Sequence, residues 1–157
     1  MTVDYTRCYH QGVRVPDLDA AMAELGPALG ITWCAPQQRE QQVWLPEEGE
    51  ATLPLRFTYS AEGPQHVELL EGPAGSIWDG REAPGLHHVG LWSDDVGGDS
   101  EQLLAAGWTL RLAQRPPEDG YGAFTYLQPP TGSLLVELVW SALEPMFARW
   151  FAGGPLG

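Results

Sequence analysis

The sequence has few cysteines and no long apolar run. Cys8 and Cys34 are its only two cysteines, too few for a disulfide framework or a cysteine-rich zinc cluster, so we expect two buried thiols. No apolar run approaches the roughly 18 residues that a membrane-spanning helix needs. The first residues, Met1–Tyr5, lack the basic and apolar pattern of a signal peptide. We therefore expect a soluble, cytoplasmic protein with no membrane partner.

Basic residues are also scarce. The chain carries 8 Lys plus Arg against 21 Asp plus Glu, a formal net charge of −13. Such a chain repels phosphate backbones, so we expect no nucleic-acid partner. With 157 residues and 43% hydrophobic content, it can bury a sizeable core as a single domain, residues 1–157.

Two halves of the sequence repeat one order of motifs. Tyr9–Pro16 and Gly85–Trp92 share the order His-x-Gly-aliphatic, and an acidic turn and a helix-like run follow each. Each half closes on a strand with a central Val-Glu-Leu, within His66–Leu70 and Leu135–Val139. This repetition indicates an internal duplication with a shorter second half.

Hydrophobic periodicity predicts an α+β fold made of two tandem β-α-β-β-β modules. The first module spans about residues 7–71 and the second about 85–140, joined by a Gly- and Pro-rich linker at 72–84. A helix at about 142–152 follows. The expected strands cover 7–15, 38–45, 53–60 and 66–70, then 86–93, 108–113, 123–128 and 134–140. The expected module helices start after Asp17 and near Gly98, and end at Gly30 and Gly107.

Strand alternation assigns a helix-free face to each module. The first helix needs the apolar Val13 and Val15 as its partner, so His10 and Arg14 face away from it. The same parity puts four potential ligands on the helix-free faces: His10, Glu68, His88 and Glu137. If these faces form a concave cleft, the imidazoles and carboxylates suit one divalent ion, Zn²⁺, Co²⁺, Ni²⁺, Mn²⁺ or Fe²⁺, with positions left for two substrate oxygens. His87 has the wrong parity, and His66 is expected beside the ligands rather than among them.

Substrate contacts are expected on the same face. Parity places Arg14, Arg56 and Trp92 there, and the arginines would suit an anionic small molecule. Alternatively, each arginine pairs with a nearby acidic residue. Tyr126, with Phe124 on the same strand face, could complete an aromatic wall, although aromatic residues in strands are more often core.

These motifs resemble those of a known superfamily. His10-x-Gly12, Glu68–Glu71, Gly85–Val89 and Val136–Leu138 are similar to motifs of the vicinal oxygen chelate superfamily. Its members include glyoxalase I, methylmalonyl-CoA epimerase, extradiol dioxygenases, and fosfomycin and bleomycin resistance proteins. The segments Gly-Leu-His-His and Glu-Leu-Leu-Glu and the turn Pro46–Gly49 look closest to the epimerase branch.

The resemblance implies a ligand set and one catalytic residue. It implies metal ligation by His10, Glu68, His88 and Glu137, and a proton-moving role for Glu137 beside the metal-activated carbonyl. One departure from the epimerase pattern stands out. Epimerases place a second catalytic Glu three residues after the Gly of that turn, and this count reaches Thr52 here. Threonine cannot act as a general base at neutral pH.

Three functions fit these residues. The first is a metal-dependent isomerase, epimerase or lyase that acts next to the carbonyl of a small oxygenated metabolite. The second is a ligand-sequestering protein of the bleomycin-resistance kind, without chemistry. The third is an iron-dependent dioxygenase that uses two His and one Glu. A homodimer is expected because the last helix carries an apolar stripe that could pack on this domain or on a second subunit: Leu143, Met146, Phe147, Trp150 and Phe151.

Overall fold

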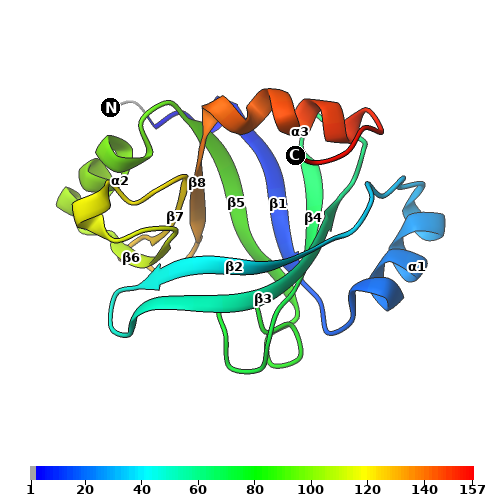
Figure 1. Ribbon diagram of the computed structural model, residues 1–157, viewed down its shortest axis with the longest axis horizontal. Coiled ribbons are helices and arrows are strands. Elements are labelled where there is room, and N and C mark those ends of the chain that lie inside the picture. Colours follow the sequence, from blue (N-terminus) through cyan, green and yellow to red (C-terminus); the bar gives the residue numbers. More distant parts are fainter. Residues whose placement is uncertain (1–2) are drawn as a thin grey trace. The chain divides into compact units, whose positions relative to one another are not determined.

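A computed structural model describes residues 3–157 (Figure 1). The first repeat consists of β1 (Cys8–Arg14), α1 (Leu18–Leu29), β2 (Gln37–Leu45), β3 (Gly49–Tyr59) and β4 (His66–Glu71). The second consists of β5 (Gly85–Ser93), α2 (Val96–Ala105), β6 (Thr109–Ala113), β7 (Phe124–Gln128) and β8 (Val136–Trp140). Helix α3 (Glu144–Phe151) follows. Among the helices of the described chain, none has the length and hydropathy to cross a membrane.

Strand pairing confirms the α+β class and the duplicated order of elements. In each repeat the first and last strands are parallel neighbours, β1 with β4 and β5 with β8. Each last strand also pairs antiparallel with the strand that precedes it. The strand order is β1-β4-β3-β2 in the first repeat and β5-β8-β7-β6 in the second, so the two arrangements correspond strand by strand.

The described chain divides into two compact units that do not coincide with the repeats. The α1 unit comprises His10–Gln41, Leu53–His87 and Pro145–Gly157. The α2 unit comprises the N-terminal residues through Tyr9, Gln42–Thr52 and His88–Glu144. His10 and Glu68 therefore belong to the α1 unit, and His88 and Glu137 belong to the α2 unit.

In the α1 unit, helix α1 begins and ends as its sequence predicts. The side chain of Asp17 accepts a hydrogen bond from the Ala20 backbone N–H at 2.9 Å, which satisfies one of the free donors of the first turn. Gly30 ends the helix with φ of 70°, a left-handed conformation that favours glycine. The helix packs on the odd-numbered face of β1 and β4, in a core formed by Val15, Leu18, Ala21 and Leu69 with Val13, Met22, Leu25, Trp33 and Val67 around it. His10 and Glu68 are thereby left on the other face.

The α2 unit repeats this design. Asp95 caps helix α2 by accepting from the Gly98 N–H at 2.9 Å, so the helix starts at Val96, slightly earlier than expected. The core between α2 and its strands contains Cys8, Val89, Leu91, Val96, Leu103, Leu127, Val136 and Leu138. His88 and Glu137 again lie on the opposite parity of β5 and β8.

Helix α3 packs on the α1 unit through aromatic side chains. Trp150 is 1% exposed, and its ring centroid lies 5.9 Å from that of Phe57 and 5.5 Å from that of Tyr59. Phe147 and Phe151 also pack on Tyr59. Trp150 is therefore covered within the chain, whereas Leu143, Met146, Phe147 and Phe151 are only partly buried. The homodimer stays a prediction.

Both cysteines are free and buried, as expected from the sequence. Burial raises the pKa of the Cys34 thiol to about 11, and the nearby Glu62 carboxylate adds to the shift. The Cys34 thiol is therefore protonated at neutral pH.

Candidate metal centre

The first His–Glu pair lies on neighbouring strands of the α1 unit. His10 Nε2 on β1 is 3.3 Å from Glu68 Oε1 on β4. His10 is fully buried and Glu68 is 6% exposed. In the parallel ladder, Glu68 is the register partner of Gly12, which has no side chain. The glycine leaves space on this face for the carboxylate to turn toward His10 two residues away.

The second pair repeats this geometry in the α2 unit. His88 Nε2 on β5 is 3.2 Å from Glu137 Oε1 on β8. Both residues are buried. Glu137 is the register partner of Gly90, two residues after His88, as Gly12 follows His10. In both repeats, therefore, the glycine of the His-x-Gly motif lies opposite a glutamate on the neighbouring strand, and the histidine contacts the carboxylate of that glutamate.

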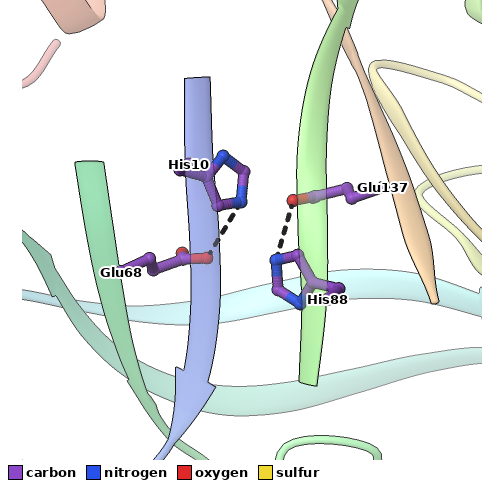
Figure 2. A group of neighbouring side chains, drawn as sticks. All are labelled: His10, Glu68, His88 and Glu137. Atoms are coloured by element: carbon purple, nitrogen blue, oxygen red, sulfur yellow. Dashed lines mark ion pairs between the residues drawn. The ribbon is translucent and has the colours of Figure 1, made fainter. Parts of the chain in front are cut away.

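The four predicted ligands form one group of potential metal donors (Figure 2). Each offers one ligand atom, and these atoms lie within 4.8 Å of one another. Two imidazoles and two carboxylates form a donor set suited to a borderline divalent cation. Burial of two carboxylates is costly unless positive charge compensates it, and a divalent ion would supply that charge. The residues present therefore fit the metal that the sequence implies.

A tyrosine flanks each glutamate, and the sequence argument missed one of them. Tyr59 on β3 is the register partner of Glu68, and Tyr126 on β7 is the register partner of Glu137. The Tyr59 ring meets His10 edge-on with centroids 5.2 Å apart, while Tyr126 lies 4.9 Å from His88. Tyr126 was predicted on this face. Tyr59 was not predicted there, although it pairs with Glu68 as Tyr126 pairs with Glu137.

A family model matches most of the chain. Residues 9–126 match the family model of the glyoxalase/bleomycin resistance protein/dioxygenase superfamily. The chain belongs to this superfamily. Its members bind a divalent metal, and the buried His/Glu group of this chain could hold one. No curated protein matches the sequence.

Solved structures of superfamily enzymes share the fold. A Streptomyces coelicolor methylmalonyl-CoA epimerase variant in complex with 2-nitronate-propionyl-CoA has a TM-score of 0.59 and 22% identity, covering 87% of this chain and 97% of its own. The Mycobacterium tuberculosis methylmalonyl-CoA epimerase has a TM-score of 0.56 and 17% identity, covering 86% of this chain and 87% of its own. A mutant 4-hydroxymandelate synthase from Streptomyces coelicolor has a TM-score of 0.56 at 13% identity, covering 85% of this chain and 48% of its own. At these identities the likeness concerns the fold alone.

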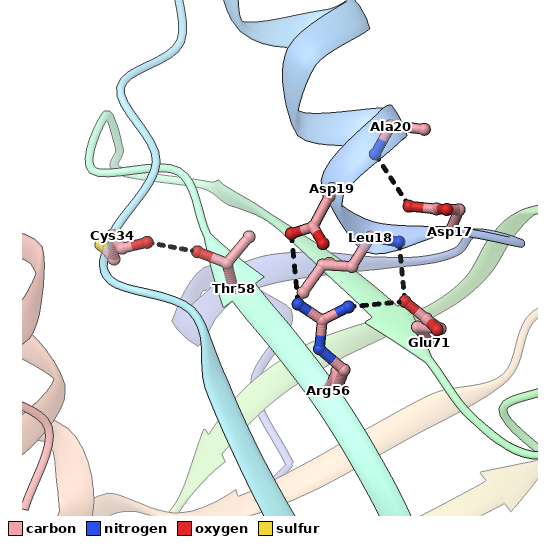
Figure 3. Close-up of polar contacts among 8 residues, drawn as sticks. All are labelled: Asp17, Leu18, Asp19, Ala20, Cys34, Arg56, Thr58 and Glu71. Atoms are coloured by element: carbon pink, nitrogen blue, oxygen red, sulfur yellow. Dashed lines mark hydrogen bonds and ion pairs between the residues drawn. The ribbon is translucent and has the colours of Figure 1, made fainter.

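Arg56 lies on the opposite face from the one predicted (Figure 3). Its guanidinium forms ion pairs with Asp19 of α1 at 3.1 Å and with Glu71 at 3.2 Å. The hydrogen bond to Asp19 is the main cause of the raised pKa of Arg56. Glu71 also accepts from the Leu18 N–H at 2.8 Å, so Arg56 helps to fix the start of α1. The predicted substrate role is therefore wrong for Arg56. The error arose because β3 is covered on both faces, so its apolar residues do not mark the helix side.

Arg14 lies on the predicted face. Its register partner on β4 is Leu70, which shares the face of Glu68. Nη1 donates to the Ile77 carbonyl at 3.1 Å, while the buried Nε has no hydrogen-bond partner within the described residues. Burial lowers the pKa of Arg14, and Asp79 partly opposes this shift. Arg14 is thus a partly desolvated cation whose hydrogen-bonding capacity is not fully used.

Trp92 and His66 are both fixed by aromatic stacking. The Trp92 ring is stacked on Tyr9 with centroids 3.8 Å apart, and it is buried. His66 stacks on Phe151 at 3.7 Å, and its Nδ1 lies 2.7 Å from the Ser60 carbonyl oxygen. Burial lowers the pKa of His66, which favours the neutral imidazole.

Thr52 is exposed and cannot replace the second catalytic glutamate of the epimerases. It lines a polar groove of about 460 Å³ with Gln42, Val43, Glu50, Ala51, Gln114 and Arg115. The β3 residues with the parity of Tyr59 are Gly49, Ala51, Leu53, Leu55 and Phe57. None of these β3 side chains can accept a proton at neutral pH.

Proposed function

We propose that His10, Glu68, His88 and Glu137 hold one divalent metal ion, and that the chain is an isomerase or lyase acting at a carbon next to a carbonyl. The observation that carries this proposal is the group of four buried donors, two imidazoles and two carboxylates. When bound, the ion would act as a Lewis acid that polarises the substrate carbonyl. Zn²⁺, Co²⁺, Ni²⁺, Mn²⁺ and Fe²⁺ all suit these donors.

The ligand charges support a divalent ion. Two carboxylates balance the charge of one dication, and two neutral imidazoles add donors without further charge. The contacts of 3.3 Å and 3.2 Å bring each imidazole nitrogen beside a carboxylate oxygen of its own unit. A donor pair in each unit therefore needs little rearrangement to become a pair of ligands.

Glu137 is our candidate for the residue that moves the substrate proton. The two glutamates occupy equivalent positions, but their tyrosine neighbours differ in packing. Tyr59 beside Glu68 is enclosed by three aromatic residues of α3, whereas Tyr126 beside Glu137 packs on Phe124 and His88. Both tyrosines are buried, at 3% and 2% exposure, so the choice of Glu137 rests on the resemblance to the isomerase members of the superfamily. A buried carboxylate at this position is suited to general-base catalysis.

Proton transfer with a single carboxylate base differs from the two-base arrangement of the epimerases that the sequence resembles. The face of β3 that carries Tyr59 has no acidic residue, and Thr52 is exposed. One carboxylate can remove a proton and return it to a neighbouring atom of the substrate, as an isomerase requires. It can instead give the proton to a departing group as the bond to that group breaks, as a lyase requires. We therefore place the activity within these classes and name no specific epimerisation.

Ligand sequestration is the second candidate. It is favoured by the same absence of an acidic side chain on the face of β3 that carries Tyr59, since a binding protein needs no second acid or base. The aromatic residues Trp92 and Tyr126 could then bind a planar ligand without reaction. Dioxygenase activity remains a third function, open to the superfamily fold.

Hydrogen–deuterium exchange distinguishes the first two candidates. The metal-loaded protein is incubated in D₂O with 2-oxo acids and acyl-CoA thioesters, and loss of the proton next to the carbonyl is followed by NMR. We expect exchange that is abolished in Glu137→Gln while metal content is kept at half or more. Binding of these compounds without exchange would overturn the enzyme proposal in favour of sequestration.

A further inference from the structure

Two buried hydrogen-bond donors on the side of the α1 unit that faces away from α1 have no acceptor among the described residues. They are Arg14 Nε on β1 and Trp150 Nε1 on α3, and neither has a hydrogen-bond partner in residues 3–157. Buried donors in folded proteins nearly always find a partner, and each exception requires an explanation. Two exceptions on one face suggest that the missing acceptor belongs to a ligand.

Strand register places both donors over one row of residues. Arg14 is the register partner of Leu70 on β4, and Leu70 is the register partner of Phe57 on β3. The indole ring of Trp150 packs against Phe57, with centroids 5.9 Å apart and planes at 76°. Arg14 and Trp150 therefore stand at the two ends of a short row with the apolar Leu70 between them.

This row adjoins the row that contains Glu68. The adjoining row on the same face consists of Gly12 on β1, Glu68 on β4 and Tyr59 on β3. Residues two apart on a strand are separated by about 7 Å. A ligand whose carbonyl lies at Glu68 would thus reach the two donors with a group two or three bonds farther along its chain.

The charge of the row indicates the nature of that group. The Arg14 guanidinium is partly desolvated, and its pKa is lowered mainly by burial. A second guanidinium, that of Arg39 on β2, lies 5.5 Å from the centroid of the Phe57 ring. Arg39 forms no ion pair with a carboxylate in the part of the chain that the structure describes. Arg39 is exposed, unlike Arg14. In a protein of net charge −13, two arginines at one row favour an anion.

We infer that Arg14 Nε–H and Trp150 Nε1–H bind a distal carboxylate of the substrate, a group separate from the carbonyl at the metal centre. The substrate is then a dicarboxylate or a carboxylate-bearing acyl compound. This inference rests on the proposed function for the position of the carbonyl. Sequence periodicity assigns Trp150 to the apolar stripe of α3, so its role as a donor emerges only from the structure.

Matched ligands isolate the distal carboxylate. 2-Oxoglutarate and 2-oxopentanoate share a 2-oxo acid head and a five-carbon chain, and only the first has a second carboxylate. 2-Oxoadipate and 2-oxohexanoate extend the comparison by one carbon. Calorimetric titration of the protein, with and without added divalent metal, gives the ratio of the two affinities for each pair. We expect at least one dicarboxylate to bind about tenfold or more tightly than its partner, the gain typical of charge-assisted hydrogen bonds.

Two variants then test the donors independently. Trp150→Phe removes the indole N–H and keeps an aromatic ring, and Arg14→Lys keeps the charge but removes Nε–H. Each should lower the affinity ratio about fivefold or more, with metal content and monocarboxylate affinity unchanged. The control variants Trp140→Phe and Arg111→Lys alter exposed residues of the same types and should leave the ratio unchanged.

The outcomes separate this inference from the proposed function. Equal affinities within both ligand pairs in the wild-type protein would overturn the carboxylate site and leave water as the partner of both donors. An affinity ratio that neither Trp150→Phe nor Arg14→Lys changes would also overturn it. If the ratio depends on both donors but the protein takes up no metal, the anion site stands and the metal-enzyme proposal fails.

Discussion

Gly12 is the register partner of Glu68 in the parallel pair of β1 and β4. The glycine provides the space across which the carboxylate reaches His10, at 3.3 Å. Gly90 and Glu137 repeat the relationship in the α2 unit. In both repeats the His-x-Gly motif thus orients a glutamate on the neighbouring strand.

Gly12→Val tests this relationship. The added side chain would occupy the face beside Glu68 and displace the carboxylate, while a β-branched residue is otherwise favourable in a strand. We expect metal affinity to fall about 10- to 100-fold, as when an orienting neighbour of a ligand is lost. Competition with a metallochromic indicator measures the affinity. Unchanged metal affinity in a folded variant would show that the glycine has no such role. Gln11→Val, which puts the same side chain at the exposed neighbouring position of β1, serves as the control.

A buried hydrogen bond joins β3 to the segment that follows α1. Thr58 Oγ1 donates to the Cys34 carbonyl at 2.7 Å, and Thr58 is fully buried (Figure 3). Thr58→Val keeps the shape of the side chain but leaves this carbonyl without its hydroxyl donor. We expect the free energy of unfolding to fall by about 1–2 kcal/mol in urea denaturation. The exposed Thr52→Val should show no comparable loss, and equal effects in the two variants would refute the assignment.

Arg56 is expected to act on stability rather than on ligand binding. Its ion pairs with Asp19 and Glu71 are partly exposed, so Arg56→Gln should cost no more than about 1 kcal/mol of unfolding free energy. Affinity for 2-oxo acids should stay at the wild-type value, because the side chain lies on the face of α1. A loss of 2-oxo acid affinity in Arg56→Gln, with stability unchanged, would restore the substrate role that the structure argues against.

Stability should decline in alkaline solution because of Cys34. The folded-state pKa of this thiol is about 11, above its ordinary value of 9.0, since burial disfavours the thiolate. Above pH 9 the unfolded chain loses its thiol proton while the folded chain keeps it. The stabilising contribution is therefore complete below pH 9 and decreases as the pH rises toward 11. Urea denaturation at pH 8 and pH 10 should show a smaller decline in Cys34→Ala than in wild type; an equal decline would mean that Cys34 is not responsible.

Much of the fold could be predicted because local signals and the duplication agree. Asp17 and Gly30 mark the ends of α1 by capping chemistry, and Val13 and Val15 identify the face that α1 covers. The four proposed ligands emerged from the same parity in two repeats. Each alone is an ordinary strand residue, so the repetition made the prediction possible.

The remaining features depend on tertiary contacts that periodicity does not contain. In β3 the apolar residues Leu55, Phe57 and Tyr59 face away from α1, because the aromatic side chains of α3 cover that side. Alternation reveals two faces but not which partner covers each, so Arg56 was assigned to the wrong one. Trp150 belongs to an apolar helical stripe by its spacing. Its relation to Arg14 appears only from the strand register, which links Arg14 to Phe57, and from the packing of the indole ring on Phe57.

Metal stoichiometry of the purified protein tests the central claim most directly. Elemental analysis after dialysis would be made on the wild type, on His10→Ala and His88→Ala from the two units, and on the control His87→Ala. We predict close to one divalent ion per chain in the wild type and in His87→Ala, and loss of this ion in both His10→Ala and His88→Ala. A wild-type protein that takes up none of Zn²⁺, Co²⁺, Ni²⁺, Mn²⁺ or Fe²⁺, or variants that keep full stoichiometry, would contradict the four-residue metal centre.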